Sequence, residues 1–213
     1  MTEPKPELLI GTSNTGKLLE ASLMLADLPF KLRTLSEFDH INSVEETGET
    51  FAENAALKAQ GYASQTGLNT IADDSGLEVD ILDGAPGIFS ARYSAQATSD
   101  ADRVSVLLAN LASVPDGQRT ARFVSAVALA DGYGKLIYSA EGICTGTITF
   151  QPRGKGGFGY DPIFVPEGYK QTLAELHLDV KNRISHRAQA LSTARTFLST
   201  DRGTLLKHPI RFR

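Results

Sequence analysis

Apolar residues recur along this chain at two spacings, and each spacing predicts a different kind of element. The helical spacing first appears in residues 17–28, where Leu19, Leu23 and Ala26 fall on one face. Shorter apolar runs bounded by polar turns predict strands. In chain order, the predicted elements are strand 7–11, helix 17–28, strand 31–35, helix 50–65, strands 69–72 and 77–82, helix 99–111, strands 120–130 and 135–147, and helix 185–198.

Capping and turn residues mark the ends of several of these elements. Thr50 stands three residues before Glu53, which is the spacing of a capping box. Ser99 and Ser185 are suitable N-caps for the helices that follow them. The segment 131–134 reads as the hairpin turn between the two long strands. Because strands alternate with helices early and pair in a hairpin later, we expect an α/β fold with a mixed sheet.

Length, charge and cysteine content narrow the class of protein. The 213 residues fit one large or two-lobed domain, since domains commonly have roughly 100–200 residues. The net charge of −4 comes without a basic stripe, which argues against a nucleic-acid partner. The single cysteine, Cys144, rules out an intrachain disulfide and suits a reducing compartment. We find neither a signal-peptide pattern nor an apolar run of roughly 18 residues, and therefore expect a cytoplasmic protein without a membrane partner.

The first candidate for chemistry is the polar loop from Gly11 to Lys17, which joins a strand to a helix. Backbone N–H groups and the helix dipole favour a phosphate at such a position. The spacing matches the G-x-x-x-x-G-K pattern of a P-loop, but Leu18 stands where that loop needs Ser or Thr to hold magnesium. An ordinary turn capped by Asn14 is the alternative interpretation.

Two acidic segments form a second candidate. Glu45, Glu46 and Glu49 lie in one polar loop, and such a run is usually a solvated surface. Asp73 and Asp74 lie between apolar residues and begin a predicted tight turn over 73–76. Adjacent buried carboxylates repel each other unless a metal or another charge compensates them. Hard oxygen ligands suit magnesium, and we favour this functional interpretation. Asx-turn chemistry at a hairpin is the alternative.

Two glycine-containing loops follow in the second half of the chain. Residues 84–93 read either as a rigid turn or as part of a site that presents Arg92. Residues 155–162 interleave glycines with Phe158 and Tyr160. Glycines let a backbone approach a ligand closely, and an aromatic ring on such a loop can stack on a nucleobase. The alternative is a hairpin loop whose rings cover the edge of the core.

Cations gather at the start of the last predicted helix. Lys181 and Arg183 precede it, and His186 and Arg187 fall in its first turn. Positive charge at a helix N-terminus opposes the helix dipole. A local rule broken without visible compensation indicates a functional site.

In their joint order and spacing, these segments resemble the Ham1-like inosine triphosphate pyrophosphatase family, and the resemblance covers residues 9–191. Ser13 departs from the glycine usual in the family and adds a side chain to a tight loop. The segments that carry the resemblance are Thr12–Lys17 (T-G-N-x-G-K), Glu45–Ala59 (E-E-T-G, then T-F-x-E-N-A-x-x-K-A), Ala72–Leu77 (A-D-D-S-G-L), Gly84–Tyr93 (G-A-P-G-x-x-S-A-R-Y), Gly157–Pro162 (G-F-G-Y-D-P) and Ser185–Arg187 (S-H-R).

The resemblance implies a two-lobed α/β fold around a long mixed sheet, with the active site in the cleft between the lobes. Residues 1–200 would form this single domain, and residues 201–213 a tail whose basic residues we read as solvated. It further implies a homodimer, Mg²⁺ as cofactor, and hydrolysis of noncanonical purine nucleoside triphosphates (ITP, dITP and XTP) to the monophosphate and pyrophosphate.

The resemblance also implies roles for individual residues. Asp74 matches the catalytic base and a metal ligand, and Glu45 matches a second metal ligand with Glu46 beside it. The matches to phosphate-side contacts are Thr12, Ser13, Asn14, Thr15, Gly16, Lys17, Lys58 and Lys181. The matches to other substrate contacts, the later ones at the base, are Ser75, Phe158, Gly159, Tyr160, Asp161, His186 and Arg187.

Two other functions compete with this one. A P-loop-type NTPase would use residues 11–17 and release orthophosphate, but Leu18 argues against it. A non-catalytic nucleotide-binding module would bind without turnover, and it would leave Glu45 and Asp74 without an evident use.

Overall fold

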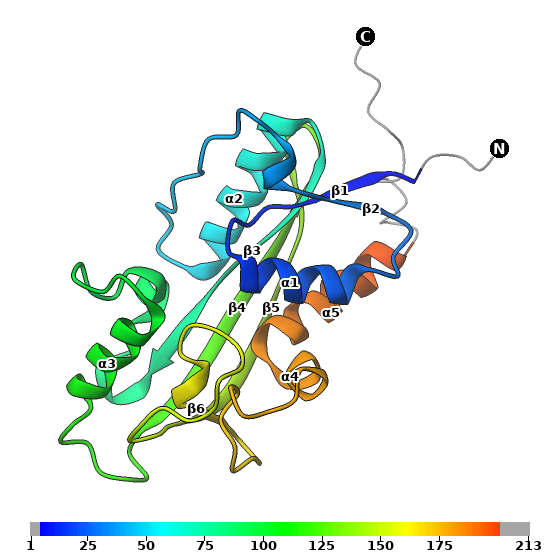
Figure 1. The fold of residues 1–213 in the computed structure, drawn as a ribbon. Helices are drawn as coiled ribbons and strands as arrows, with labels where there is room; N and C mark the ends of the chain where they lie inside the picture. Colours follow the sequence, from blue (N-terminus) through cyan, green and yellow to red (C-terminus); the bar gives the residue numbers. More distant parts are fainter. Residues whose placement is uncertain (1–4, 201–213) are drawn as a thin grey trace. The chain divides into compact units, whose positions relative to one another are not determined.

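The computed structural model describes residues 5–200 (Figure 1). Its helices, strands and short 3₁₀ turns alternate as an α/β chain. The strands are β1 (Glu7–Ile10), β2 (Lys31–Thr34), β3 (Asn69–Val79), β4 (Thr120–Ala130), β5 (Leu136–Ile148) and β6 (Phe164–Pro166), and the α-helices are α1 (Thr15–Leu25), α2 (Phe51–Thr66), α3 (Asp100–Asn110), α4 (Leu178–Ile184) and α5 (His186–Ser199).

The strands form one sheet in the order β2-β1-β3-β4-β5-β6 within the described residues. β1 is parallel to both of its neighbours, with Leu9 opposite Arg33 on β2 and Thr70 on β3. β5 and β6 are antiparallel. The turn between β4 and β5 closes as predicted, since Asp131 N–H donates to Lys135 O. The mixed sheet confirms the predicted fold class.

β3 corrects the most consequential local prediction. The sequence predicted two short strands around a turn at 73–76, but β3 runs unbroken from Asn69 to Val79. Asp73 and Asp74 therefore lie in the middle of an extended, buried strand. The chain instead turns after the 3₁₀ segment Asp80–Leu82, at Asp83 and Gly84, which both have positive φ. Cations from distant helices compensate the two carboxylates, so the acids need no turn to reach water.

Helix α1 turns a different face to the core from the predicted one. Leu19 and Leu23 are 55% and 50% exposed, whereas Ala21 and Leu25 are buried. Glu20 is also buried, at 4% exposure. A helix rarely buries a carboxylate without a partner, and this one has a cation from α5 as its partner. The prediction failed because that acid looked like a solvent-facing residue.

The helix ends follow local capping rules. Thr50 caps α2 by accepting from Glu53 N–H, but the Glu53 carboxylate accepts from Glu49 N–H, so only half of the predicted capping box forms. Ser99 caps α3 as predicted.

Other predictions concern the C-terminal helices and the membrane. Lys181 and Arg183 belong to α4, a short helix that the sequence did not predict, and the last helix starts after it. Within residues 5–200 no helix is long and apolar enough to cross a membrane. The predicted tail 201–213 lies outside the described residues.

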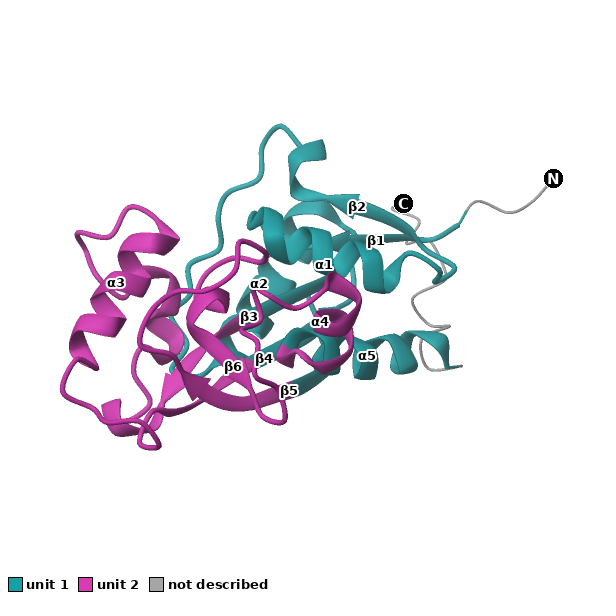
Figure 2. Ribbon diagram, turned by 60° about the horizontal axis from the view of Figure 1, so that its bottom comes forward, with its two compact units in different colours: residues 1–74, 125–141, 187–213 teal, residues 75–124, 142–186 magenta. Residues whose placement is uncertain are grey.

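The chain divides into two compact units (Figure 2). Unit 1 contains residues 1–74, 125–141 and 187–213, and unit 2 contains residues 75–124 and 142–186. Each unit has its own apolar core. The core of unit 1 gathers Leu8, Ile10, Leu25, Ile71, Leu129 and Leu198, and that of unit 2 gathers Leu77, Leu107, Phe123, Cys144, Ile163 and Phe164.

Candidate active site

The loop between β1 and α1 is a capped helix start. The side chain of Asn14 accepts from Lys17 N–H at 3.0 Å, and Asn14 N–H donates to Thr12 Oγ1 at 3.2 Å. Gly11 begins the loop where a Cβ would lie 3.0 Å from the ring of Tyr62. The cap agrees with the alternative interpretation of this loop as an ordinary turn capped by Asn14. The loop exposes Ser13, Asn14 and Thr15, which leaves it accessible to an anion.

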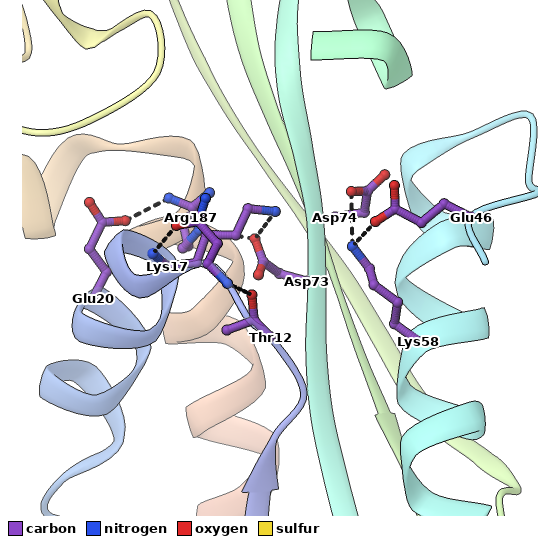
Figure 3. Close-up of polar contacts among 9 residues, drawn as sticks. Thr12, Lys17, Glu20, Glu46, Lys58, Asp73, Asp74 and Arg187 are labelled. Carbon is purple, nitrogen blue, oxygen red and sulfur yellow. Dashed lines mark hydrogen bonds and ion pairs between the residues drawn. The ribbon is translucent and has the colours of Figure 1, made fainter. Parts of the chain in front are cut away.

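On one face of β3, Asp73 joins the partly buried Lys17 and the buried Arg187 (Figure 3). Its Oδ2 lies 3.2 Å from Lys17 Nζ and accepts from Arg187 Nε at 3.0 Å. Arg187 also donates from its terminal nitrogen to Glu20 Oε2 at 2.6 Å. This group brings α1, β3 and α5 together within unit 1.

The electrostatics of this group are strongly coupled. Burial by itself raises the pKa of Asp73, but the positive charges of Lys17 and Arg187 outweigh it and hold that pKa well below its usual range. Burial lowers the pKa of Lys17, and Asp73 only partly offsets this effect. Asp73 is therefore ionised at neutral pH.

On the opposite face of β3, Asp74 contacts a single ammonium group. Lys58 Nζ donates to Asp74 Oδ1 at 3.0 Å and to Glu46 Oε1 at 2.7 Å. The second oxygen of Asp74, Oδ2, is buried and has no hydrogen-bond partner among the residues that the structure describes. Burial raises the pKa of Asp74 above its usual value, against the opposing charge of Lys58.

The alternation of side chains along a strand explains how two adjacent carboxylates are tolerated. Successive residues of a strand point to opposite faces, and Figure 3 shows Asp73 directed toward α1 and α5 and Asp74 directed toward α2. Each carboxylate thus meets its own set of cations. The repulsion that the sequence suggested is relieved by geometry and does not require a metal.

The residues around Asp74 nevertheless suit a hard cation. Within residues 5–200 no group of three or more His, Cys, Asp or Glu side chains is close enough to hold a metal alone. Magnesium commonly takes only one or two carboxylates and completes its shell with water and phosphate. Asp74 and Glu46 already share one ammonium, and Asp74 Oδ2 is an available oxygen. Glu45, which precedes Glu46 in the sequence, is exposed.

The predicted base-binding loop lies in unit 2. Asp161 Oδ2 accepts from Phe158 N–H at 2.9 Å and from Lys181 Nζ at 2.5 Å. The Lys181 ammonium lies 4.9 Å from the centre of the Phe158 ring. Gly157 and Gly159, on either side of the ring, have φ of 69° and 60°. Only glycine adopts such angles freely, so these glycines let Phe158 project from the loop.

The 84–93 loop packs against this predicted base-binding loop. Tyr160 Oη donates to Ser90 O at 3.0 Å. Ser90 Oγ in turn accepts from Leu77 N–H and donates to Gly87 O. Burial raises the pKa of Tyr160, so this phenol stays protonated as a donor. The loops 84–93 and 155–162 are thus joined by hydrogen bonds within unit 2.

The last motif is divided between the two units. His186 stacks on Phe123 with ring centres 4.6 Å apart and nearly parallel planes, in unit 2. Arg187, the next residue, belongs to the carboxylate group of unit 1. Ser75 follows Asp74 on β3 and is the first residue of unit 2. Asp73 and Glu20 thus compensate the positive charge of Arg187 at the start of α5, which the sequence did not reveal.

Two residues of this arrangement escaped the sequence analysis. Glu20 was not selected at all, although an acid beside Ala21 on the buried face of α1 was a usable signal. Asp73 was noticed only as a neighbour of Asp74. Its contacts to Lys17 and Arg187 join residues 56 and 114 positions away, and no local pattern reveals such contacts.

Comparison with known proteins gives consistent matches over nearly the whole chain. A model of the Ham1 family matches residues 8–197. A "dITP/XTP pyrophosphatase" of Desulforamulus reducens is 45% identical over 193 residues, covering 91% of this chain and 96% of the relative. One of Streptomyces coelicolor is 49% identical over 187 residues, covering 86% and 92%. The solved structure of a HAM1 protein from Coxiella burnetii has a TM-score of 0.82 at 42% identity, covering 91% of this chain and 98% of its own.

Proposed function

The chain belongs to the Ham1 family, and from this premise we propose that it hydrolyses noncanonical purine nucleoside triphosphates to the monophosphate and pyrophosphate. The substrates would be ITP, dITP and XTP, which agrees with the name dITP/XTP pyrophosphatase carried by its relatives. The observation that carries the proposal is the buried Asp74 carboxylate, with one oxygen on Lys58 and the other without a partner within residues 5–200.

Asp74 has the properties of a general base. Burial raises its pKa toward the range in which a carboxylate accepts a proton effectively. Its second oxygen is available to orient the attacking water and take its proton. The ammonium of Lys58 holds the carboxylate in place from the other side.

We propose Mg²⁺ as the cofactor, held by Asp74 together with Glu45 or Glu46. The resemblance points to Glu45, while the ammonium that Glu46 shares with Asp74 supports Glu46. When bound, the ion would neutralise the triphosphate and polarise the phosphorus that is attacked. Lys17 and the loop Thr12–Gly16 would contact the phosphates and stabilise the charge that builds on the leaving pyrophosphate.

Base selection would come from the loop Phe158–Asp161 together with His186 and Arg187. A site built to hydrogen-bond a 6-keto purine leaves buried groups unpaired when adenine brings a 6-amino group, and such mismatches are strongly rejected. The ring of Phe158, held between two glycines, would stack on the base. Ser75 and Lys181 complete the proposed substrate contacts.

Several wider expectations remain part of the proposal. We propose that residues 1–200 act as one two-lobed domain, that the enzyme works as a homodimer in the cytoplasm, and that it needs neither nucleic acid nor a membrane. A P-loop-type NTPase is disfavoured, because Leu18 occupies the position of the magnesium-binding hydroxyl.

The proposal is tested by a product assay with ITP and Mg²⁺ in ¹⁸O-labelled water. We expect IMP and pyrophosphate in equal amounts, with the label in IMP if water attacks the α-phosphorus. Chelation of divalent cations should stop the reaction, and Asp74→Asn is the matched inactive control. Formation of IDP and orthophosphate would contradict the proposal and restore the P-loop alternative.

A further inference from the structure

The first residue of helix α3 contacts the proposed base-binding loop, 59 positions further along the chain. Asp100 Oδ2 accepts a hydrogen bond from Gly159 N–H at 2.7 Å. The other oxygen of Asp100 pairs with Arg103, one turn further along the same helix. Both partners lie in unit 2, and Asp100 lies outside every sequence segment that carries the family resemblance.

The contact matters because of where Gly159 N–H lies. Phe158 is flanked by two peptide groups, and each donates to a carboxylate: Phe158 N–H donates to Asp161, and Gly159 N–H donates to Asp100. Fixing both peptide planes fixes φ and ψ of Phe158. The ring direction then has only the side-chain torsions left to vary.

The loop needs this support because of its composition. Gly157 and Gly159 both have positive φ, and glycine loses more conformational freedom on ordering than any other residue. A Cβ on Gly157 would lie 2.0 Å from Asp161 Oδ2, so the loop could not be stiffened there by a larger residue. Part of the rigidity therefore has to come from outside the loop, and the hydrogen bond that Asp100 accepts from Gly159 N–H supplies it.

The start of α3 does not itself require Asp100. Ser99 caps the helix by accepting from Asp102 N–H, and the Asp102 carboxylate accepts from Ser99 N–H and Thr98 N–H. This reciprocal capping box satisfies the helix end. An acid at the N-terminus also interacts favourably with the helix dipole, but Asp102 already has that role.

We propose that Asp100 is a positioning residue for base recognition, acting through Gly159 to hold the Phe158 ring in the orientation that stacks on a purine. The inference rests on the proposed function, because it gives the loop 157–161 the task of binding the base. Asp100 touches neither the base nor the phosphates in this scheme. Stacking alone does not distinguish one purine from another, but the ring orientation sets where the 6-keto edge of the base lies. Loss of Asp100 therefore costs ITP a hydrogen bond that ATP does not make, and it leaves the chemical step at Asp74 unchanged.

The test compares Asp100→Ala with Asp100→Asn, which keeps an acceptor oxygen. We expect Asp100→Ala to lower kcat/KM for ITP about tenfold, mostly through KM, because one charge-assisted hydrogen bond is lost. The kcat/KM for ATP should change little, so the ratio of kcat/KM for ITP to kcat/KM for ATP decreases. Asp100→Asn should restore most of the ratio.

The matched control is Asp102→Ala, which removes the capping box of the same helix end. Melting temperatures show whether each variant folds. If Asp102→Ala narrows the ITP-to-ATP ratio as much as Asp100→Ala does, the effect is a general weakening of α3 and the proposal is overturned. An unchanged ratio in folded Asp100→Ala overturns it as well.

Amide hydrogen exchange and product binding separate this inference from the proposed function. In Asp100→Ala we expect faster exchange at Gly159 N–H and weaker binding of IMP, neither of which requires turnover. Unchanged exchange or unchanged IMP affinity rejects the positioning role, even if the wild type is an active pyrophosphatase. A wild type that releases no pyrophosphate from ITP rejects the proposed function instead, while the exchange result still reports on the loop.

Discussion

The two faces of β3 carry the same chemical group in opposite situations. On one face, a single oxygen of Asp73 contacts Lys17 and Arg187, and the same arginine also binds Glu20. On the other face, Asp74 shares the Lys58 ammonium with Glu46 and keeps one buried oxygen without a partner among the described residues. The pKa of Asp73 is held low by its cations, whereas burial raises that of Asp74.

This difference separates a carboxylate that is suited to a structural role from one that is suited to chemistry. A buried carboxylate whose pKa is lowered stays ionised and stabilises the fold. A buried carboxylate whose pKa is raised, and one of whose oxygens accepts no hydrogen bond, is suited to accept a proton or to bind a cation. Adjacent positions on one strand are enough to create both, because the strand directs them to opposite faces.

The largest effect should come from Asp74→Asn. The substitution keeps the shape of the side chain but removes the proposed base and one metal-binding charge. We expect kcat to fall by roughly 10²–10⁴-fold, the usual range for loss of a general base, with little change in melting temperature. Steady-state assays of pyrophosphate release and a thermal melt check both parts. A folded variant with normal turnover would show that Asp74 is not the catalytic group.

Asp73→Asn should lower the free energy of unfolding more than it lowers activity, the opposite of what we expect for Asp74→Asn. It leaves the partly buried Lys17 ammonium without its carboxylate, and it removes a carboxylate from the buried Arg187. Breaking a buried ion pair on one side typically costs roughly 3–5 kcal/mol, which urea denaturation can measure. If the stability loss is no larger than that of Asp74→Asn, the contrast between the two faces fails.

The pH dependence of stability offers a second measure of Asp73. Its pKa is lower in the folded protein than in the unfolded chain, so the unfolded chain binds the proton first as the pH falls. The stabilising contribution is thus fully present above the unfolded value of about 3.9 and is lost below it. We expect the free energy of unfolding, measured without divalent cations, to fall less steeply with decreasing pH in Asp73→Asn than in the wild type.

The parts of the fold that sequence predicted well depend on local chemistry. Ser99 caps α3, and the turn at 131–134 joins β4 to β5, because a cap or a turn involves residues only a few positions apart. The continuous β3 could not be predicted in the same way. An extended strand through Asp73 and Asp74 is stable only because distant helices supply cations to each face.

The site shows the same limit. The order of motifs identified the family resemblance and selected Asp74, Lys58 and the 157–161 loop. It did not reveal that Arg187 pairs with Asp73 and Glu20, because the pairing joins three elements that are far apart in sequence. Sequence therefore selected candidate residues, and only the structure assigned each charge to its partner.

Arg187→Lys should have a moderate effect that shows whether the Asp73 face also serves the substrate. Lysine keeps the charge but cannot contact Asp73 and Glu20 with the planar fork of arginine. If Arg187 also reads a 6-keto oxygen, kcat/KM for ITP should fall by about one to two decades more than for ATP. Measuring both substrates on the same variant decides the matter. Equal losses would mean that Arg187 does not read the base.

The smallest effect should come from Ser13→Gly, which restores the residue usual in the family in the loop before α1. Within residues 5–200 the non-glycine residue with positive φ is Asp83, so Ser13 has a backbone conformation that any residue adopts. Its side chain is exposed. Glycine would gain nothing in the folded state and would add freedom to the unfolded chain, lowering stability by roughly 0.4–1 kcal/mol. We expect kcat for ITP to stay within about twofold of the wild type, because the amides of the loop and Lys17 are unchanged. A large gain in kcat would show instead that Ser13 restrains the loop in a conformation less suited to phosphate. The arrangement of Lys17 beside Asp73 would then differ from the one that works in catalysis.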